Sequence, residues 1–134
     1  MAMKVKKKLR LTRYMKRATK GFKGYPAASV AWYGPNADRA SKAVVGILLA
    51  SGEEPEHIRK WTHATRDVRR DVKINAEIDA YIDEHNVTSV ALARKIVGCP
   101  HESEVDYEGD YCPDPDCAYW FGRERWTGKL VSEI

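Results

Sequence analysis

All three cysteines of this 134-residue chain fall within one short stretch, from Cys99 to Cys117. Residues 98–117 also contain seven acidic residues, three prolines and no Lys or Arg. Proline interrupts regular secondary structure, and a surplus of like charges opposes compaction. Such a segment has little core of its own, so a bound metal or a cross-link is needed to hold it in one conformation.

The spacing of the cysteines favours a metal. Cys99 and His101 are followed, after ten residues, by Cys112 and Cys117. Zinc favours four Cys or His ligands in a tetrahedron, and two short-spaced ligand pairs joined by a connector suit such a site. Clustered cysteines in a reducing cytosol bind metal more often than they form disulfides. The pattern predicts one structural Zn²⁺ per chain, held by Cys99, His101, Cys112 and Cys117.

Other interpretations of this segment remain open. Cys112 and Cys117 are also compatible with a local disulfide, and all three cysteines with packed thiols. The fourth ligand is alternatively one of three carboxylates, Asp110, Asp114 or Asp116.

A catalytic zinc is a weaker match. The zinc deaminase signature has Glu two residues after its His, and Pro before the first Cys of a C-x-x-C pair. Here Ser103 and Tyr111 hold those places. A binding protein is therefore favoured over an enzyme. The alternative is a metal-dependent hydrolase or deaminase-like enzyme, with Glu102 or Glu104 as the base.

The charge is strongly divided along the chain. Residues 1–24 contain ten Lys or Arg and no acid, whereas 25–134 contain 13 basic and 19 acidic residues, a net of −6. This division predicts a basic leader, residues 1–24, attached to a separate folded body. Apolar residues at 11, 14, 15, 18 and 22 predict an amphipathic helix from about Lys8 to Lys20.

The leader is expected to bind nucleic acid, because Lys and Arg neutralise phosphates largely without regard to sequence. RNA, DNA and the ribosome are all candidate partners. The residues assigned to this contact are Lys6, Lys7, Lys8, Arg10, Arg13, Lys16, Arg17 and Lys20. Alternatives are a helix docked on the body, an acidic protein partner and an anionic membrane surface.

The body is predicted to be α+β. Residues 28–33 and 43–49 indicate a β-hairpin, and residues 55–62 and a segment capped by Asp71 indicate two helices. Residues 87–92 indicate a third strand, parallel to 43–49. A helix-turn-helix with its second helix at 89–97 is the competing interpretation. The domains are then a core at 25–97 and a zinc-stapled, loop-rich lobe at 98–134.

The C-terminal segment mixes aromatic residues with arginines. The residues are Tyr119, Trp120, Phe121, Arg123, Arg125 and Trp126. Packing of the zinc lobe is the favoured role, with base stacking or docking of a protein as alternatives. No apolar run approaches the ~18 residues of a membrane span, and the basic N-terminus lacks a signal-peptide core, so a cytoplasmic protein is expected.

Several short motifs resemble those of one protein family. They are Gly24-Tyr25-Pro26, Trp32-Tyr33-Gly34-Pro35, Ala40-Ser41-Lys42, Val45-Gly46-Ile47, Gly98-Cys99-Pro100-His101-Glu102, Asp106-Tyr107, Cys112-Pro113, Tyr119-Trp120 and Arg125-Trp126. They are similar to a family of small bacterial proteins of uncharacterised activity, over about residues 24–128. The resemblance implies a bacterial cytoplasmic setting and favours a metal site, but it implies no reaction. The family's second cysteine pair is a tighter C-P-x-C, so the insertion between Cys112 and Cys117 departs from the pattern.

Overall fold

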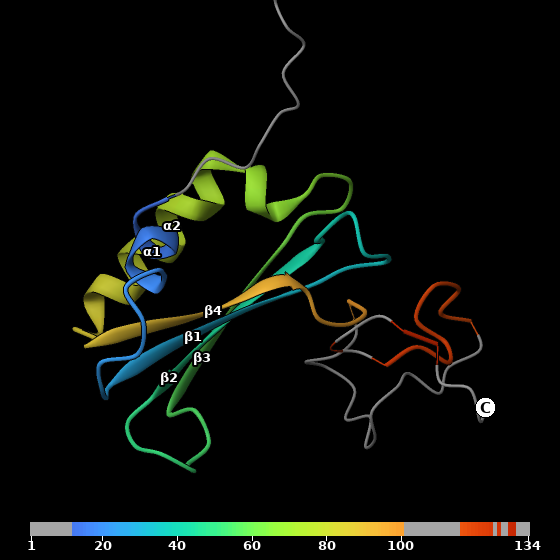
Figure 1. Ribbon diagram of the computed structural model, residues 1–134. Coiled ribbons are helices and arrows are strands. Elements are labelled where there is room, and N and C mark those ends of the chain that lie inside the picture. Colours follow the sequence, from blue (N-terminus) through green and yellow to red (C-terminus); the bar gives the residue numbers. More distant parts are fainter. Residues whose placement is uncertain (1–11, 101–115, 125, 127–128, 131–134) are drawn as a thin grey trace, which may run out of the picture.

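The computed structural model describes residues 12–100, 116–124, 126 and 129–130. In this part of the chain, two α-helices lie on one face of a four-stranded sheet (Figure 1). The strands are β1 (Ala27–Tyr33), β2 (Lys42–Leu48), β3 (His57–Thr62) and β4 (Ser89–Ile96), in the order β3-β2-β1-β4. The helices are α1 (Arg13–Ala18) and α2 (Val72–Glu84), and a 3-10 turn, Val68–Arg70, precedes α2. The predicted α+β class is confirmed.

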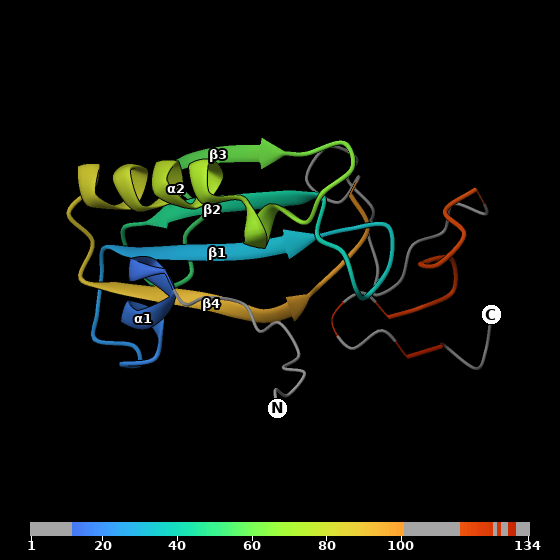
Figure 2. The ribbon, with the colours of Figure 1, turned by 90° about the horizontal axis from the view of Figure 1, so that it is seen from above.

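The sheet is a meander followed by a crossover. β1 and β2 form the predicted hairpin, and β3 pairs antiparallel with the far side of β2. The chain then crosses the sheet through α2 and enters β4, which pairs parallel to β1 (Figure 2). β1 therefore lies in the middle of the sheet, between an antiparallel and a parallel neighbour.

The prediction of a helix over residues 55–62 is wrong, because His57–Thr62 forms β3. Pairing with β2 decides the structure here, from Ile47↔His57 to Lys42↔Thr62. The sequence gives no clear alternation at this edge, since Ile58 is 54% exposed while Trp61, on the other face, is buried. Tertiary pairing overrides a weak local preference of this kind.

The third predicted strand exists, but its expected partner is wrong. β4 pairs with β1 instead of β2, because β2 already has β1 on one side and β3 on the other. The edge of β1 is the one left for a parallel strand. The helix-turn-helix interpretation is also wrong, since residues 89–96 are extended.

The sequence signals for α2 are confirmed. The Asp71 carboxylate caps the helix by accepting a hydrogen bond of 3.0 Å from the Ile74 N–H. Ile78 and Ile82, one turn apart, are fully buried against the sheet. Asn86 follows in the left-handed conformation, with φ of 49°, and ends the helical segment as expected.

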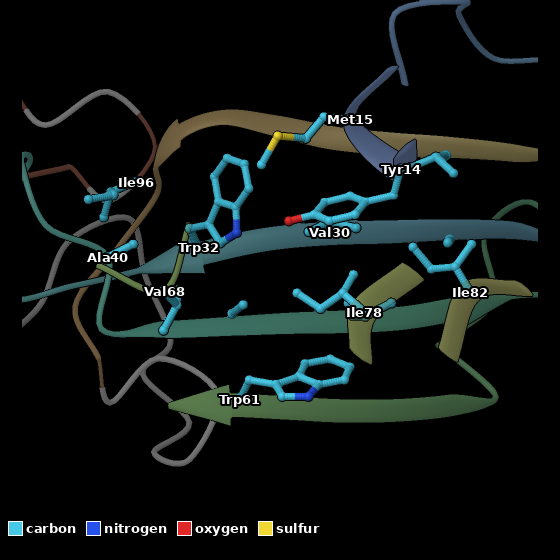
Figure 3. Close-up of a cluster of buried hydrophobic side chains, with 14 of the residues drawn as sticks. Tyr14, Met15, Val30, Trp32, Ala40, Trp61, Val68, Ile78, Ile82 and Ile96 are labelled. Carbon is cyan, nitrogen blue, oxygen red and sulfur yellow. The ribbon is translucent and has the colours of Figure 1, made fainter. Parts of the chain in front are cut away.

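The hydrophobic core lies between the sheet and the helices (Figure 3). β1 contributes Val30 and Trp32, and α1 contributes Tyr14 and Met15. Residues 13–18 of the basic leader are therefore packed into the same core as the sheet. Among the described residues, no helix has the length and apolar character that crossing a membrane requires.

The leader helix is shorter than the predicted Lys8–Lys20 at both ends, since Thr12 is extended and the helix stops two residues before Lys20. It begins at Arg13, after the cap residue Thr12, and it ends at Ala18; residues 1–11 lie outside the described part. Gly21 and Gly24 have positive φ and turn the chain toward β1. Phe22, expected on the apolar stripe, follows the helix and is 62% exposed. Position 22 is therefore not part of the buried face.

Candidate metal centre and nucleic-acid interface

The backbone of Gly34, just after β1, contacts the chain on both sides of the cysteine-rich segment. Its N–H donates a 2.8 Å hydrogen bond to the Gly98 carbonyl, next to Cys99. Its carbonyl accepts a 2.6 Å hydrogen bond from the Trp120 Nε1, three residues after Cys117. Trp120 is only 1% exposed, so this bond is made in the protein interior. The first loop of the hairpin thus holds both ends of the candidate metal segment.

Two of the four predicted zinc ligands lie in the described part of the chain. Cys99 and Cys117 are both buried, and both belong to the main hydrophobic cluster together with Trp120. Seventeen intervening residues separate them in sequence. The fold therefore brings into one buried cluster two thiols that the sequence alone places on separate turns.

The other two predicted ligands, His101 and Cys112, lie outside the described residues, as do the alternatives Asp110 and Asp114. In the part of the chain that is described, no group of three or more metal-binding side chains occurs. The described geometry thus comprises half of the predicted ligand set.

Trp120 is buried, as expected for an aromatic residue that packs against the rest of the protein. Its neighbours in the C-terminal segment are more exposed, and Arg123 lies over the Tyr119 ring at 4.2 Å from its centroid. Packing is therefore the observed role of Trp120, which leaves it no free face for a base or a partner.

The second candidate site is the surface around α1. Tyr14 fixes the helix, because its N–H donates to the Asp79 carboxylate at 2.8 Å and its hydroxyl donates to the Asn75 Oδ1 at 2.8 Å. Burial, together with the nearby Asp79, raises the pKa of the Tyr14 hydroxyl, which therefore stays a neutral donor. Burial also raises the pKa of Asp79, and the hydrogen bond from Tyr14 opposes that rise.

Two of the arginines predicted to contact nucleic acid form interactions within the protein. Arg13 forms an ion pair with Asp83 of α2. Arg17 lies 3.7 Å from the same carboxylate and donates a 3.0 Å hydrogen bond to the Val87 carbonyl. Exposed ion pairs contribute little to stability, so these contacts orient the arginines more than they hold the helix.

The remaining described cations of the segment face solvent. Lys16 of α1 is exposed because the helix buries Tyr14 and Met15 instead, and Lys20 and Lys23, in the segment that follows the helix, are exposed as well. Four predicted contacts, Lys6, Lys7, Lys8 and Arg10, lie outside the described residues. A helix docked on the body is one of the alternatives for the leader, and α1 is such a helix, with Lys16 exposed.

Sequence reasoning missed residues that the fold adds to this surface. Arg94 of β4 lines a hollow together with Thr19 and Phe22. Thr88 and Ser89, where β4 begins, line a second hollow with Lys20 and Lys23. The sequence around these residues does not indicate this role. They come close to α1 because β4 pairs with β1 in the folded sheet. No local signal marks the role of Gly34 either, because Gly98 and Trp120 reach it only in the folded chain.

Comparisons of the chain with protein-family models, with curated proteins and with solved structures found no match. The function is therefore argued from the geometry of these two sites.

We predict that Gly34→Ala strongly destabilises the protein. A Cβ at position 34 would lie 1.9 Å from the Arg39 carbonyl oxygen, so the loop that contacts Gly98 and Trp120 must move. We expect a loss of about 2 kcal/mol or more in the free energy of unfolding in urea, with faster labelling of Cys99 by a thiol reagent.

The matched control is Gly52→Ala, in the turn between β2 and β3. Gly52 has a positive φ, unlike Gly34, and a Cβ there meets no atom within 4 Å. The left-handed backbone alone costs about 1–2 kcal/mol for an alanine. Equal stability of the two variants, with Cys99 still protected in Gly34→Ala, would contradict the role given to Gly34.

Proposed function

We propose that this chain is a non-enzymatic bacterial cytoplasmic protein that binds nucleic acid through the cationic surface around α1, with one structural Zn²⁺ in its C-terminal lobe. The observation that carries the proposal is the orientation of α1. Its apolar side is buried in the core, Lys16 faces solvent, and the segment after the helix carries the exposed Lys20 and Lys23. In the sequence, five more basic residues precede this segment within residues 1–11.

Electrostatics supports a polyanion as the partner. The carboxylates closest to this surface belong to α2, and Asp83 is already engaged by Arg13 and Arg17. Lys16, Lys20 and Lys23 are exposed, so their charges are available to a ligand. Lysine side chains in such an arrangement bind phosphates and release counterions, which gives affinity without base specificity.

The zinc proposal rests on the donor chemistry. Cys99 and Cys117 are thiols in one buried cluster, and Cys112 and His101 complete the set in sequence. Zinc bound by three Cys and one His leaves no coordination position for substrate, so its role is structural. We propose that it links the turn after β4 to the turn before Trp120.

The metal proposal predicts one zinc per chain in protein purified without added metal, measured by elemental analysis. Cys117→Ser removes a ligand, and we expect it to lower the zinc content to a small fraction. His57→Asn, which changes an exposed histidine on β3, should leave one zinc per chain. A metal-free protein, or full zinc retention in Cys117→Ser, would contradict this site.

For nucleic acid, we predict that Lys20→Glu combined with Lys23→Glu weakens binding to a labelled 20-nucleotide RNA by roughly tenfold or more. Each lost phosphate contact also lowers the slope of log affinity against log salt by about 0.7 for a single strand. Fluorescence anisotropy across a salt series measures both quantities.

The control has the same change in net charge at a distant place. Arg70→Glu combined with Lys73→Glu alters exposed residues at the start of α2, away from β4. We expect its affinity and salt slope to remain near those of the unchanged protein. The proposed interface fails if both double variants weaken binding equally, or if the unchanged protein binds no RNA.

A further inference from the structure

Two hollows lie side by side along β4, under the segment that follows α1. The first, of about 370 Å³, is mainly apolar and is lined by residues that include Met15, Phe22, Trp32 and Leu92. The side chain of Met15, from α1, lies next to that of Trp32, from β1 (Figure 3). A volume of this order suits a small organic group. Arg94 adds one cation to this lining.

The second hollow, of about 210 Å³, is polar. Its lining includes three cations from the leader segment, Arg17, Lys20 and Lys23, and two residues with hydroxyl groups, Thr88 and Ser89. Arg17 is held in place by its hydrogen bond to the Val87 carbonyl. Several cations around a small hollow favour a compact, highly charged anion such as a phosphate.

The two hollows are neighbours in the fold. Gly21 lines both of them, and successive parts of β4 line the two in turn: residues 88–89 the polar hollow and residues 90–94 the apolar one. Gly21 has φ of 83°, a backbone conformation that leaves the chain folded over the strand without a side chain between the hollows. An apolar site therefore adjoins an anion site.

A nucleotide has the same two parts, a flat aromatic base next to a phosphate. We propose that these hollows bind one nucleotide of a single-stranded nucleic acid, with the base in the apolar hollow against Phe22 and the phosphate among Arg17, Lys20 and Lys23. The inference rests on the nucleic-acid binding proposed above and names the form of nucleic acid that this surface selects.

Phe22 is the side chain best placed to contact the base. It is 62% exposed and lies in edge contact with Tyr25, at 5.0 Å between ring centroids. Stacking of a base on an aromatic ring is tolerant of sequence, and exposed aromatics among cations are typical of single-strand binding surfaces. Arg94 adds a guanidinium beside the base.

The site also disfavours a duplex. A paired base lies inside the helical stack and reaches such a hollow only after it is unpaired and flipped out, which costs free energy. The phosphates of a duplex remain available to Lys20 and Lys23. An experiment can therefore distinguish the base contact from the phosphate contact, because only a single strand uses the base contact.

The test compares Phe22→Ala with the unchanged protein on two labelled probes, a 12-nucleotide oligo(dT) and a 12-base-pair DNA duplex. We expect the unchanged protein to prefer the single strand, and Phe22→Ala to weaken that binding by roughly 5- to 100-fold while duplex binding changes less than twofold. Ile58→Ala, which removes another exposed apolar side chain, on β3, should alter neither.

The outcomes separate the two proposals. If the unchanged protein binds both probes equally, or Phe22→Ala leaves oligo(dT) binding intact, the nucleotide site is wrong although nucleic-acid binding stands. If neither probe binds, the proposed function itself is wrong. Because Phe22 is largely exposed, thermal unfolding should show an unchanged midpoint for Phe22→Ala, which makes its binding result interpretable.

Discussion

The burial of Tyr14 decides how the basic N-terminal segment is presented. Its ring lies in the core, its hydroxyl donates to Asn75 and its backbone N–H donates to Asp79, so one residue joins α1 to α2 at two points. A helix held in this way has a fixed rotation about its axis. Lys16 is consequently exposed, and the segment after the helix, which carries Lys20 and Lys23, is directed over the start of β4. The cationic surface depends on this arrangement.

Gly34 has a similar role at the other end of the sheet. Because it lacks a side chain, the loop between β1 and β2 folds back on itself closely enough to contact the Arg39 carbonyl. The glycine's own N–H and carbonyl are then free to bond Gly98 and Trp120. The sheet thus positions both sides of the cysteine-rich segment, and the proposed metal would add to an interaction that the backbone already makes.

The elements that the sequence predicts correctly are those with a signal in their own residues. The hairpin and α2 are marked by β-branched runs and by the Asp71 cap, and both are found as expected. β3 is not, because its one buried residue, Trp61, leaves no clear periodicity. The partner of β4 follows from which sheet edge remains, a property of the whole sheet.

The candidate sites follow the same division. The spacing of Cys99 and Cys117 and the run of leader lysines are visible in the sequence. The contribution of Arg94 and Thr88 to the cationic surface depends on the tertiary fold, as does the exposure of Phe22, which follows from the end of α1 at Ala18. Periodicity alone extends the helix and places Phe22 on the wrong side.

The central claim is that α1 is docked on the sheet before any nucleic acid binds. Amide hydrogen exchange of the free protein, at low salt and without nucleic acid, tests it most directly at the Tyr14 N–H. This group donates to the half-buried Asp79 carboxylate, so the account predicts that it exchanges slowly, on the timescale of the buried α2 amides. Exchange of Tyr14 at the rate of an unfolded chain, with α2 still protected, would contradict the account.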